Sequence, residues 1–148
     1  MVLFLILAIF FVSLDRFLKL IALKTTTDYQ IIGDLFKFSF AHNYNIAFSL
    51  PLSGAILEIL ISIIIIILIV YSLILAKRDD YKYLFSLTFI IFGAISNLLD
   101  RIKYGFVIDY LDLEYFTVFN IADMMIVGGA LLIFIVHFIN SKHQGEMQ

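Results

Sequence analysis

Apolar residues gather into four long segments that are separated by polar stretches. The segments run over about residues 2–23, 55–76, 83–99 and 121–139. A helix needs about 20 predominantly apolar residues to cross the hydrocarbon core of a bilayer. The pattern therefore predicts four transmembrane helices, with both chain termini on one side of the membrane.

The two longer polar stretches carry a period of two. Within residues 35–40, three phenylalanines alternate with Lys37 and Ser39, as in a strand with one buried face. Residues 107–110 are strand-like again. We therefore expect a small β-sheet on the membrane surface, opposite the termini, within about residues 25–54 and 101–120. The predicted fold class is a mainly α membrane protein with this sheet, and the length of 148 residues predicts a single domain.

Composition supports an integral membrane protein and excludes several classes of function. The chain is 63% hydrophobic and its mean hydropathy is +1.06, well above the values of soluble domains. It has no cysteine, which excludes disulfides, thiolate metal sites and a cysteine nucleophile. With 10 basic and 12 acidic side chains and no basic stripe, we expect no nucleic-acid partner. Basic residues are shared almost evenly between the two sides, so they do not fix the orientation.

Carboxylates and carboxamides lie at the edges of the last two apolar segments. Asp109 and Asp123 flank a short polar connection and could meet in space. Two adjacent carboxylates that share one proton can activate a water molecule against an amide. An acid–base hydrolase is therefore the first hypothesis. The alternative is structural: Asn120 caps the last helix, Asp123 completes the cap, and Asp109 is a solvated loop residue.

Other polar residues allow a structural and a functional interpretation. Asp15 and Lys19 are spaced as a helical ion pair, which either satisfies itself or lets Lys19 contact a lipid headgroup. Arg101 is expected to pair with Asp100 at the end of the third segment, one turn after Asn97. No HExxH motif or grouped metal ligands occur in the sequence, so neither a metal nor another cofactor is expected.

Five motif blocks in sequence order resemble one known family. They are Asp15–Lys19 (D-x-x-x-K), Asn43–Phe48 (N-x-G-x-A-F), Gly93–Arg101 (G-A-x-x-N-x-x-D-R), Val107–Tyr110 (V-V-D-F) and Phe119–Asp123 (F-N-x-A-D). The family is lipoprotein signal peptidase, or signal peptidase II, the aspartic peptidase of bacterial plasma membranes. The resemblance extends over nearly the whole chain.

The resemblance implies an endopeptidase that removes the signal peptide from diacylglyceryl-modified prolipoproteins by cutting just before the lipidated cysteine. It assigns catalysis to Asp109 and Asp123. It assigns substrate binding or support to polar residues around them: Asp15, Lys19, Asn43, Asn97, Asp100, Arg101 and Asn120. It also implies cytoplasmic termini, an active site at the extracytoplasmic face of the plasma (inner) membrane, contact with membrane lipids, a monomeric state and inhibition by cyclic depsipeptides of the globomycin type.

The chain departs from the family pattern at three usual glycine positions, which here are Asn45, Phe92 and Ser96. Asparagine tolerates a positive φ better than most residues, so Asn45 is compatible with a turn. The departures at Phe92 and Ser96 are expected to affect the packing of the third helix.

Two further classes of function remain to be weighed. One is a small transporter or ion-conducting subunit, and the other is a non-catalytic membrane scaffold. A transporter usually carries its acidic residues near the bilayer midplane, on broken helices. Here Asp100, Asp109 and Asp123 lie toward one membrane face, which favours chemistry at the surface.

Overall fold

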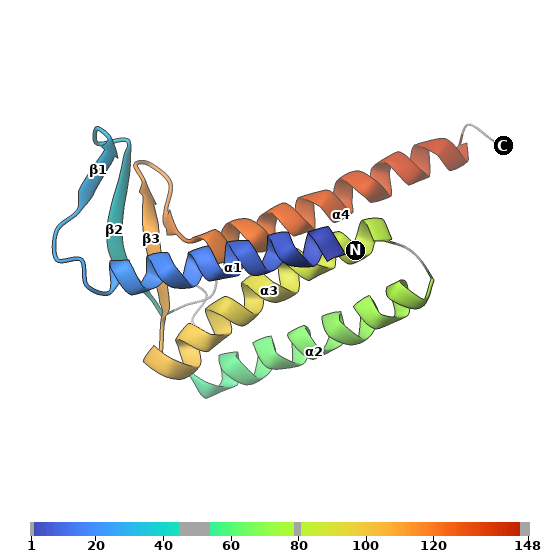
Figure 1. Cartoon of the computed structure of the whole chain (residues 1–148), viewed down its shortest axis with the longest axis horizontal. Coiled ribbons are helices and arrows are strands. Elements are labelled where there is room, and N and C mark those ends of the chain that lie inside the picture. Colours follow the sequence, from blue (N-terminus) through green and yellow to red (C-terminus); the bar gives the residue numbers. More distant parts are fainter. Residues whose placement is uncertain (1, 45–53, 79–80, 146–148) are drawn as a thin grey trace.

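The structure is a computed structural model that describes residues 2–44, 54–78 and 81–145. Its four helices lie along one another, and a small sheet stands across one end of them (Figure 1). In chain order the elements are α1 (Val2–Ala22), β1 (Tyr29–Ile32), β2 (Phe36–Asn43), α2 (Ala55–Lys77), α3 (Tyr81–Tyr104), β3 (Val107–Leu113), β4 (Val118–Phe119) and α4 (Ile121–Gly145). The predicted mainly helical class with a small β-sheet is confirmed, and the structure shows that the sheet is antiparallel.

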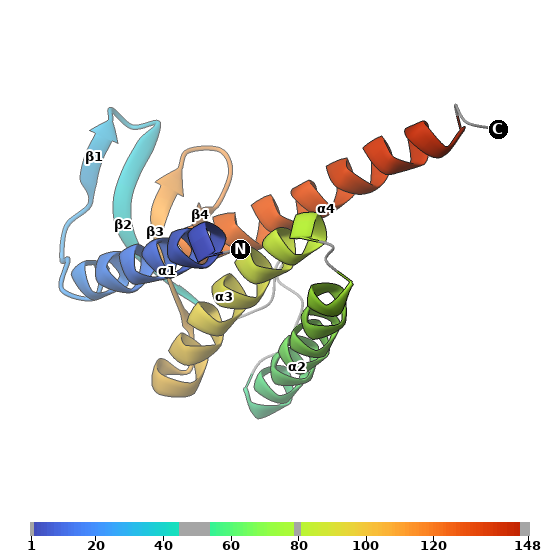
Figure 2. The ribbon, with the colours of Figure 1, turned by 45° about the vertical axis from the view of Figure 1, so that its right-hand side comes forward.

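Helix α3 is central, because it packs against α1, α2 and α4 (Figure 2). Two glycines bring α3 and α4 into close contact. A Cβ atom at Gly93 would lie 2.5 Å from the carbonyl oxygen of Ala122, and one at Gly129 would lie 2.7 Å from that of Ser86. Side chains at these two positions would force the helices apart, so the glycines set the distance between α3 and α4.

The sheet is antiparallel, with the strand order β1-β2-β3-β4. Its core cluster joins Ile108 and Tyr110 of β3 to Ala22 at the end of α1. The predicted alternation of β2 is not present in the expected form, because Ser39 is buried whereas Phe38 and Phe40 beside it are only half-buried. The register between β2 and β3 shifts between Phe38 and Ala41, and such a bulge interrupts the simple two-residue period.

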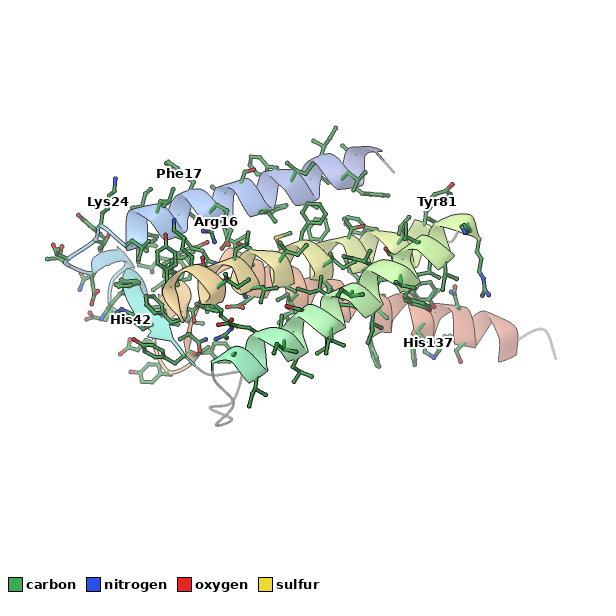
Figure 3. The ribbon with its side chains drawn as sticks, turned by 90° about the horizontal axis from the view of Figure 1, so that it is seen from below. Arg16, Phe17, Lys24, His42, Tyr81 and His137 are labelled. Carbon is green, nitrogen blue, oxygen red and sulfur yellow. The ribbon has the colours of Figure 1, made fainter. Side chains whose placement is uncertain are left out.

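The prediction of four transmembrane helices is wrong by one. Within the described residues, three helical segments are long and apolar enough to cross a membrane: Ala55–Lys77, Tyr81–Tyr104 and Ile121–Lys142. Helix α1 is not among them, because Asp15, Arg16 and Lys19 interrupt its apolar run. These charges turn inward, whereas the neighbouring Phe17 is 59% exposed and points away from the other helices (Figure 3).

Candidate active site

The candidate site lies where β3 and the start of α4 meet the ends of α1 and α3. Asp109 is placed by β3 and is 2% exposed. Asp123 stands in the first turn of α4 and is half-buried. The sequence-predicted pair is therefore carried by two different elements, and their relative position depends on how β3 is attached to α4.

Asp109 is held by two carboxamides. The Nδ2 group of Asn43 donates to Asp109 Oδ2 at 3.0 Å, and Nδ2 of Asn120 donates to Asp109 Oδ1 at 2.6 Å. Asn43 reaches Asp109 because β2 pairs with β3, which sets Asn43 opposite Val107 and Ala41 opposite Asp109. Both carboxylate oxygens thus accept a hydrogen bond from a neutral donor.

Asp123 is oriented by the start of its own helix and by α3. Its backbone N–H donates to Asn120 Oδ1 at 2.8 Å, and its Oδ2 accepts from the backbone N–H of Asn120 at 3.2 Å. This reciprocal arrangement is a capping box, as the structural interpretation of these two residues expected. Asp123 Oδ1 also accepts a hydrogen bond of 2.7 Å from Asn97 Nδ2. The structural role of Asp123 in the cap is therefore compatible with a role in chemistry, because the cap holds its carboxylate in one orientation.

The two carboxylates interact electrostatically. Burial, and to a smaller extent the nearby negative charge of Asp123, raises the pKa of Asp109 to about 7. The hydrogen bonds from Asn43 and Asn120 oppose the shift, because they stabilise the ionised form. Asp109 can therefore hold a proton near neutral pH, beside a second carboxylate.

Lys19 contacts three polar residues next to this pair. Its side chain is 1% exposed, and its ammonium lies 2.9 Å from Asp15 Oδ2, 2.8 Å from Asp100 Oδ2 and 2.9 Å from Asn97 Oδ1. These three partners account for the three donors of an ammonium. Of the two interpretations of Lys19, the structure favours the internal ion pair over contact with a lipid headgroup.

Two cations of α1 form described ion pairs with Asp100. They are Lys19 and Arg16, whose guanidinium also donates to the carbonyl of Ser96 at 3.3 Å. The pairing of Asp100 with Arg101, which the sequence suggested, stays a prediction. The described hydrogen bonds of Arg101 reach the carbonyl oxygens of Asn43 and Tyr44, each at 3.4 Å. Arg101 thus holds the end of β2 near the site.

Asp15 collects hydrogen bonds from three elements besides its ion pair. Its oxygens accept from the hydroxyl groups of Ser96 and Tyr110 and from the backbone N–H of Ala122. Tyr110 and Arg16 were not singled out from the sequence. Tyr110 follows Asp109 directly in a motif block, but it reads there as one more apolar strand residue.

All nine sequence-predicted site residues meet in one connected network. The links run from Asp15 and Asp100 through Lys19 to Asn97, on to Asp123 and Asn120, and from Asn120 through Asp109 to Asn43 and Arg101. Residues 45–48 of the second motif block, including Asn45, lie outside the described residues. In the part of the chain that the structure describes, no three histidine or acidic side chains gather as a metal site.

Comparison with known proteins gives consistent matches. The family model described as Signal peptidase (SPase) II matches residues 7–139. A "Lipoprotein signal peptidase" of Caldanaerobacter subterraneus subsp. tengcongensis is 36% identical over 129 residues, which cover 84% of this chain and 88% of that protein. One of Clostridium tetani is 36% identical over 132 residues, covering 84% of this chain and 85% of the relative.

The fold matches solved structures described as bacterial membrane enzymes. One has a TM-score of 0.83 at 24% identity and covers 97% of this chain and 92% of its own. Another has a TM-score of 0.76 at 25% identity and covers 92% of both chains.

Proposed function

Because the chain belongs to the signal peptidase II family, we propose that it is an aspartic endopeptidase of lipoprotein maturation. Its single peptidase domain removes the signal peptide from diacylglyceryl-modified prolipoproteins by cleaving just before the lipidated cysteine. The observation that carries the proposal is that Asp109 and Asp123 interact electrostatically and that each is oriented by a carboxamide side chain. Asp109, whose pKa is about 7, lets the pair hold one proton at neutral pH.

In the proposed reaction one aspartate is ionised and the other is protonated. The ionised carboxylate takes a proton from a water molecule, whose oxygen attacks the scissile carbonyl carbon. The protonated carboxyl group donates its proton to the carbonyl oxygen, which gives a tetrahedral intermediate. The carboxyl group that took the proton from water then donates it to the leaving nitrogen as the C–N bond breaks, and the other carboxylate takes a proton back from a hydroxyl group of the intermediate. The pair ends with one proton, as it began, and no acyl-enzyme forms.

The surrounding network supports this chemistry by fixing both carboxylates before substrate arrives. Asn120 donates to Asp109 and caps the helix that carries Asp123, so a single side chain aligns both. Asn97 on α3 donates a hydrogen bond to Asp123 and helps to fix that carboxylate. Prepositioned donors of this kind lower the reorganisation that the reaction requires.

The position of the site suits a substrate that is itself anchored in the bilayer. The site lies at the sheet end of the helices, and the N-terminus of α1 lies toward the other end (Figure 1). We propose that the start of α1 and the end of α4, which both lie away from the sheet, are cytoplasmic, with α1 lying along the three apolar helices. The sheet and the site would then lie at the extracytoplasmic face. The acyl chains of the substrate would then stay among the membrane lipids, in contact with exposed side chains such as Ile63 and Ile67 of α2.

A transporter is the less favoured alternative, because Asp15, Asp100 and Asp123 are engaged by cations or by a carboxamide within the network at one end of the helices.

For a peptidase with this site, a cyclic depsipeptide of the globomycin type would inhibit by placing a hydroxyl group between Asp109 and Asp123. We propose that the protein acts as a monomer, since all nine site residues come from one chain.

The proposal is tested with purified protein and two versions of one prolipoprotein, with and without the diacylglyceryl group on its cysteine. We expect cleavage of the lipid-modified version alone, with the new N-terminus at the modified cysteine. Equal cleavage of both versions would contradict the proposed substrate class. Cleavage of neither would contradict the proposed activity.

A further inference from the structure

Two hydroxyl groups meet on the buried carboxylate of Asp15. Ser96 Oγ donates to Asp15 Oδ2 at 2.6 Å, and the Tyr110 hydroxyl donates to Asp15 Oδ1 at 2.9 Å. Asp15, Ser96 and Tyr110 are each 0% exposed. In the motif pattern that the chain resembles, glycine usually stands at position 96 and phenylalanine at position 110. Both departures therefore add a hydroxyl group to the same carboxylate.

The Tyr110 hydroxyl also accepts a hydrogen bond. The backbone N–H of Ile121 donates to it at 3.2 Å, and the next N–H, that of Ala122, donates to Asp15 Oδ1 at 3.2 Å. The first N–H groups of a helix have no partner within the helix. Side chains from β3 and α1 thus supply the partners that let α4 begin at Ile121.

Tyr110 connects the two elements that carry the catalytic pair. Neighbouring residues of a strand point to opposite faces, so the side chains of Tyr110 and Asp109 lie on opposite faces of β3. The Tyr110 hydroxyl contacts the start of α4, and Asp123 follows two residues after Ile121. A shift at this contact would change the distance between Asp109 and Asp123.

We propose that Tyr110 and Ser96 are positioning residues, which act through the Asp15 carboxylate to hold Asp109 and Asp123 at their working separation. Ser96 acts from α3, because its hydrogen bond fixes the Asp15 oxygen that also contacts Lys19. Tyr110 acts directly, because its hydroxyl group contacts both Asp15 and α4. The kinetic part of this inference rests on the proposed function.

The test uses Tyr110→Phe, Ser96→Ala and the double variant, with purified full-length protein and lipid-modified prolipoprotein. Tyr104→Phe and Ser86→Ala are the matched controls. The Ser86 hydroxyl group is buried but bonds within its own helix, to the carbonyl of Lys82. Tyr104 packs at the edge of the sheet cluster, outside the Asp15 network.

We expect Tyr110→Phe to lower kcat about tenfold, as a small misplacement of reacting groups does, and to leave KM within about twofold. Ser96→Ala should lower kcat in the same way. The loss in the double variant should be smaller than the product of the single losses, because both hydroxyl groups act through one carboxylate. Both controls should keep the kcat of the parent protein.

A purely structural role would lower the unfolding temperature without changing kcat in the folded protein, and that result would overturn the proposal. A loss confined to KM, or equal losses in the controls, would overturn it as well. Hydrogen exchange at the Ile121 amide tests the bridge without any cleavage assay. Faster exchange in Tyr110→Phe than in Tyr104→Phe supports the bridge even if the parent protein cleaves nothing, whereas equal exchange refutes it.

Discussion

The ammonium of Lys19 on α1 and the side-chain oxygen of Asn97 on α3 are joined by a hydrogen bond of 2.9 Å. Asn120 Nδ2 donates to the same oxygen at 3.2 Å. With its oxygen engaged by two donors, Asn97 must turn its Nδ2 group toward Asp123, 2.7 Å away. A buried cation on the first helix therefore sets the orientation of a carboxylate on the last.

Replacement of Lys19 by methionine should lower both stability and turnover. The change removes the ammonium that pairs with Asp15 and Asp100, and it leaves Asp100 its described ion pair with Arg16. Breaking a buried ion pair by removing one partner typically costs about 3–5 kcal/mol. The measurements are the unfolding temperature in detergent and kcat. The matched control is Lys24→Met, at an exposed lysine of the same region (Figure 3), and an equal effect of the two variants would contradict the assigned role.

The rate of cleavage should depend on pH as a bell-shaped curve. Catalysis needs one proton on the pair, so the rate falls at high pH when both carboxylates are ionised and at low pH when both are protonated. Because the pKa of Asp109 is about 7, the basic limb should fall as the pH rises through about 7. A profile that stays flat from about pH 6 to about pH 9, on both sides of that pKa, would contradict the shared proton.

The same raised pKa predicts how stability depends on pH. Asp109 titrates at about 7 in the folded protein, against an ordinary value of 3.8. Between these values the folded chain binds more protons than the unfolded chain, so stability falls as the pH rises through this range. Asp109→Asn should remove this part of the pH dependence and make the protein relatively more stable at pH values above about 7. Glu114→Gln, at an exposed acid near the end of β3, should leave the dependence unchanged.

Gly129→Ala should destabilise the protein, whereas Gly128→Ala should not. A Cβ atom at Gly129 would lie 2.7 Å from both the carbonyl oxygen of Ser86 and Cγ1 of Ile90, but one at Gly128 meets no atom within 4 Å. Overpacking of this kind costs about 1–3 kcal/mol. Thermal unfolding of the two variants in the same detergent tests the prediction. Equal unfolding temperatures would show that α3 and α4 can separate freely.

Much of the fold followed from the sequence, because apolar runs of helical length and short alternating stretches are local features. The four helices begin close to where the pattern placed them. The number of membrane-spanning helices was not predicted correctly, because the first apolar segment has sufficient length but contains the charges of Asp15, Arg16 and Lys19. The burial of Ser39 depends on a register shift that alternation alone does not encode.

The sequence predicted which residues form the candidate site, but it did not predict which cations of α1 pair with Asp100. The motif blocks identified the residues that the structure brings together, yet the partner expected for Asp100 was its neighbour Arg101. The described ion pairs of Asp100 are with Arg16 and Lys19 on α1, which the sequence did not predict. Such contacts span about 80 residues of sequence, so only the packing of α1 on α3 determines them. For the same reason, the bridge made by Tyr110 could not be read from its motif.

The central claim is that Asp109 and Asp123 form the catalytic pair, and their replacement by asparagine tests it most directly. A carboxamide is nearly isosteric with a carboxyl group but cannot exchange the proton. Cleavage of lipid-modified prolipoprotein should therefore fall by at least about a thousandfold in Asp109→Asn and in Asp123→Asn, while both variants remain folded. Asp112→Asn, on the same strand as Asp109, should cleave like the parent protein. Near-normal cleavage by a folded Asp109→Asn or Asp123→Asn variant would contradict the account.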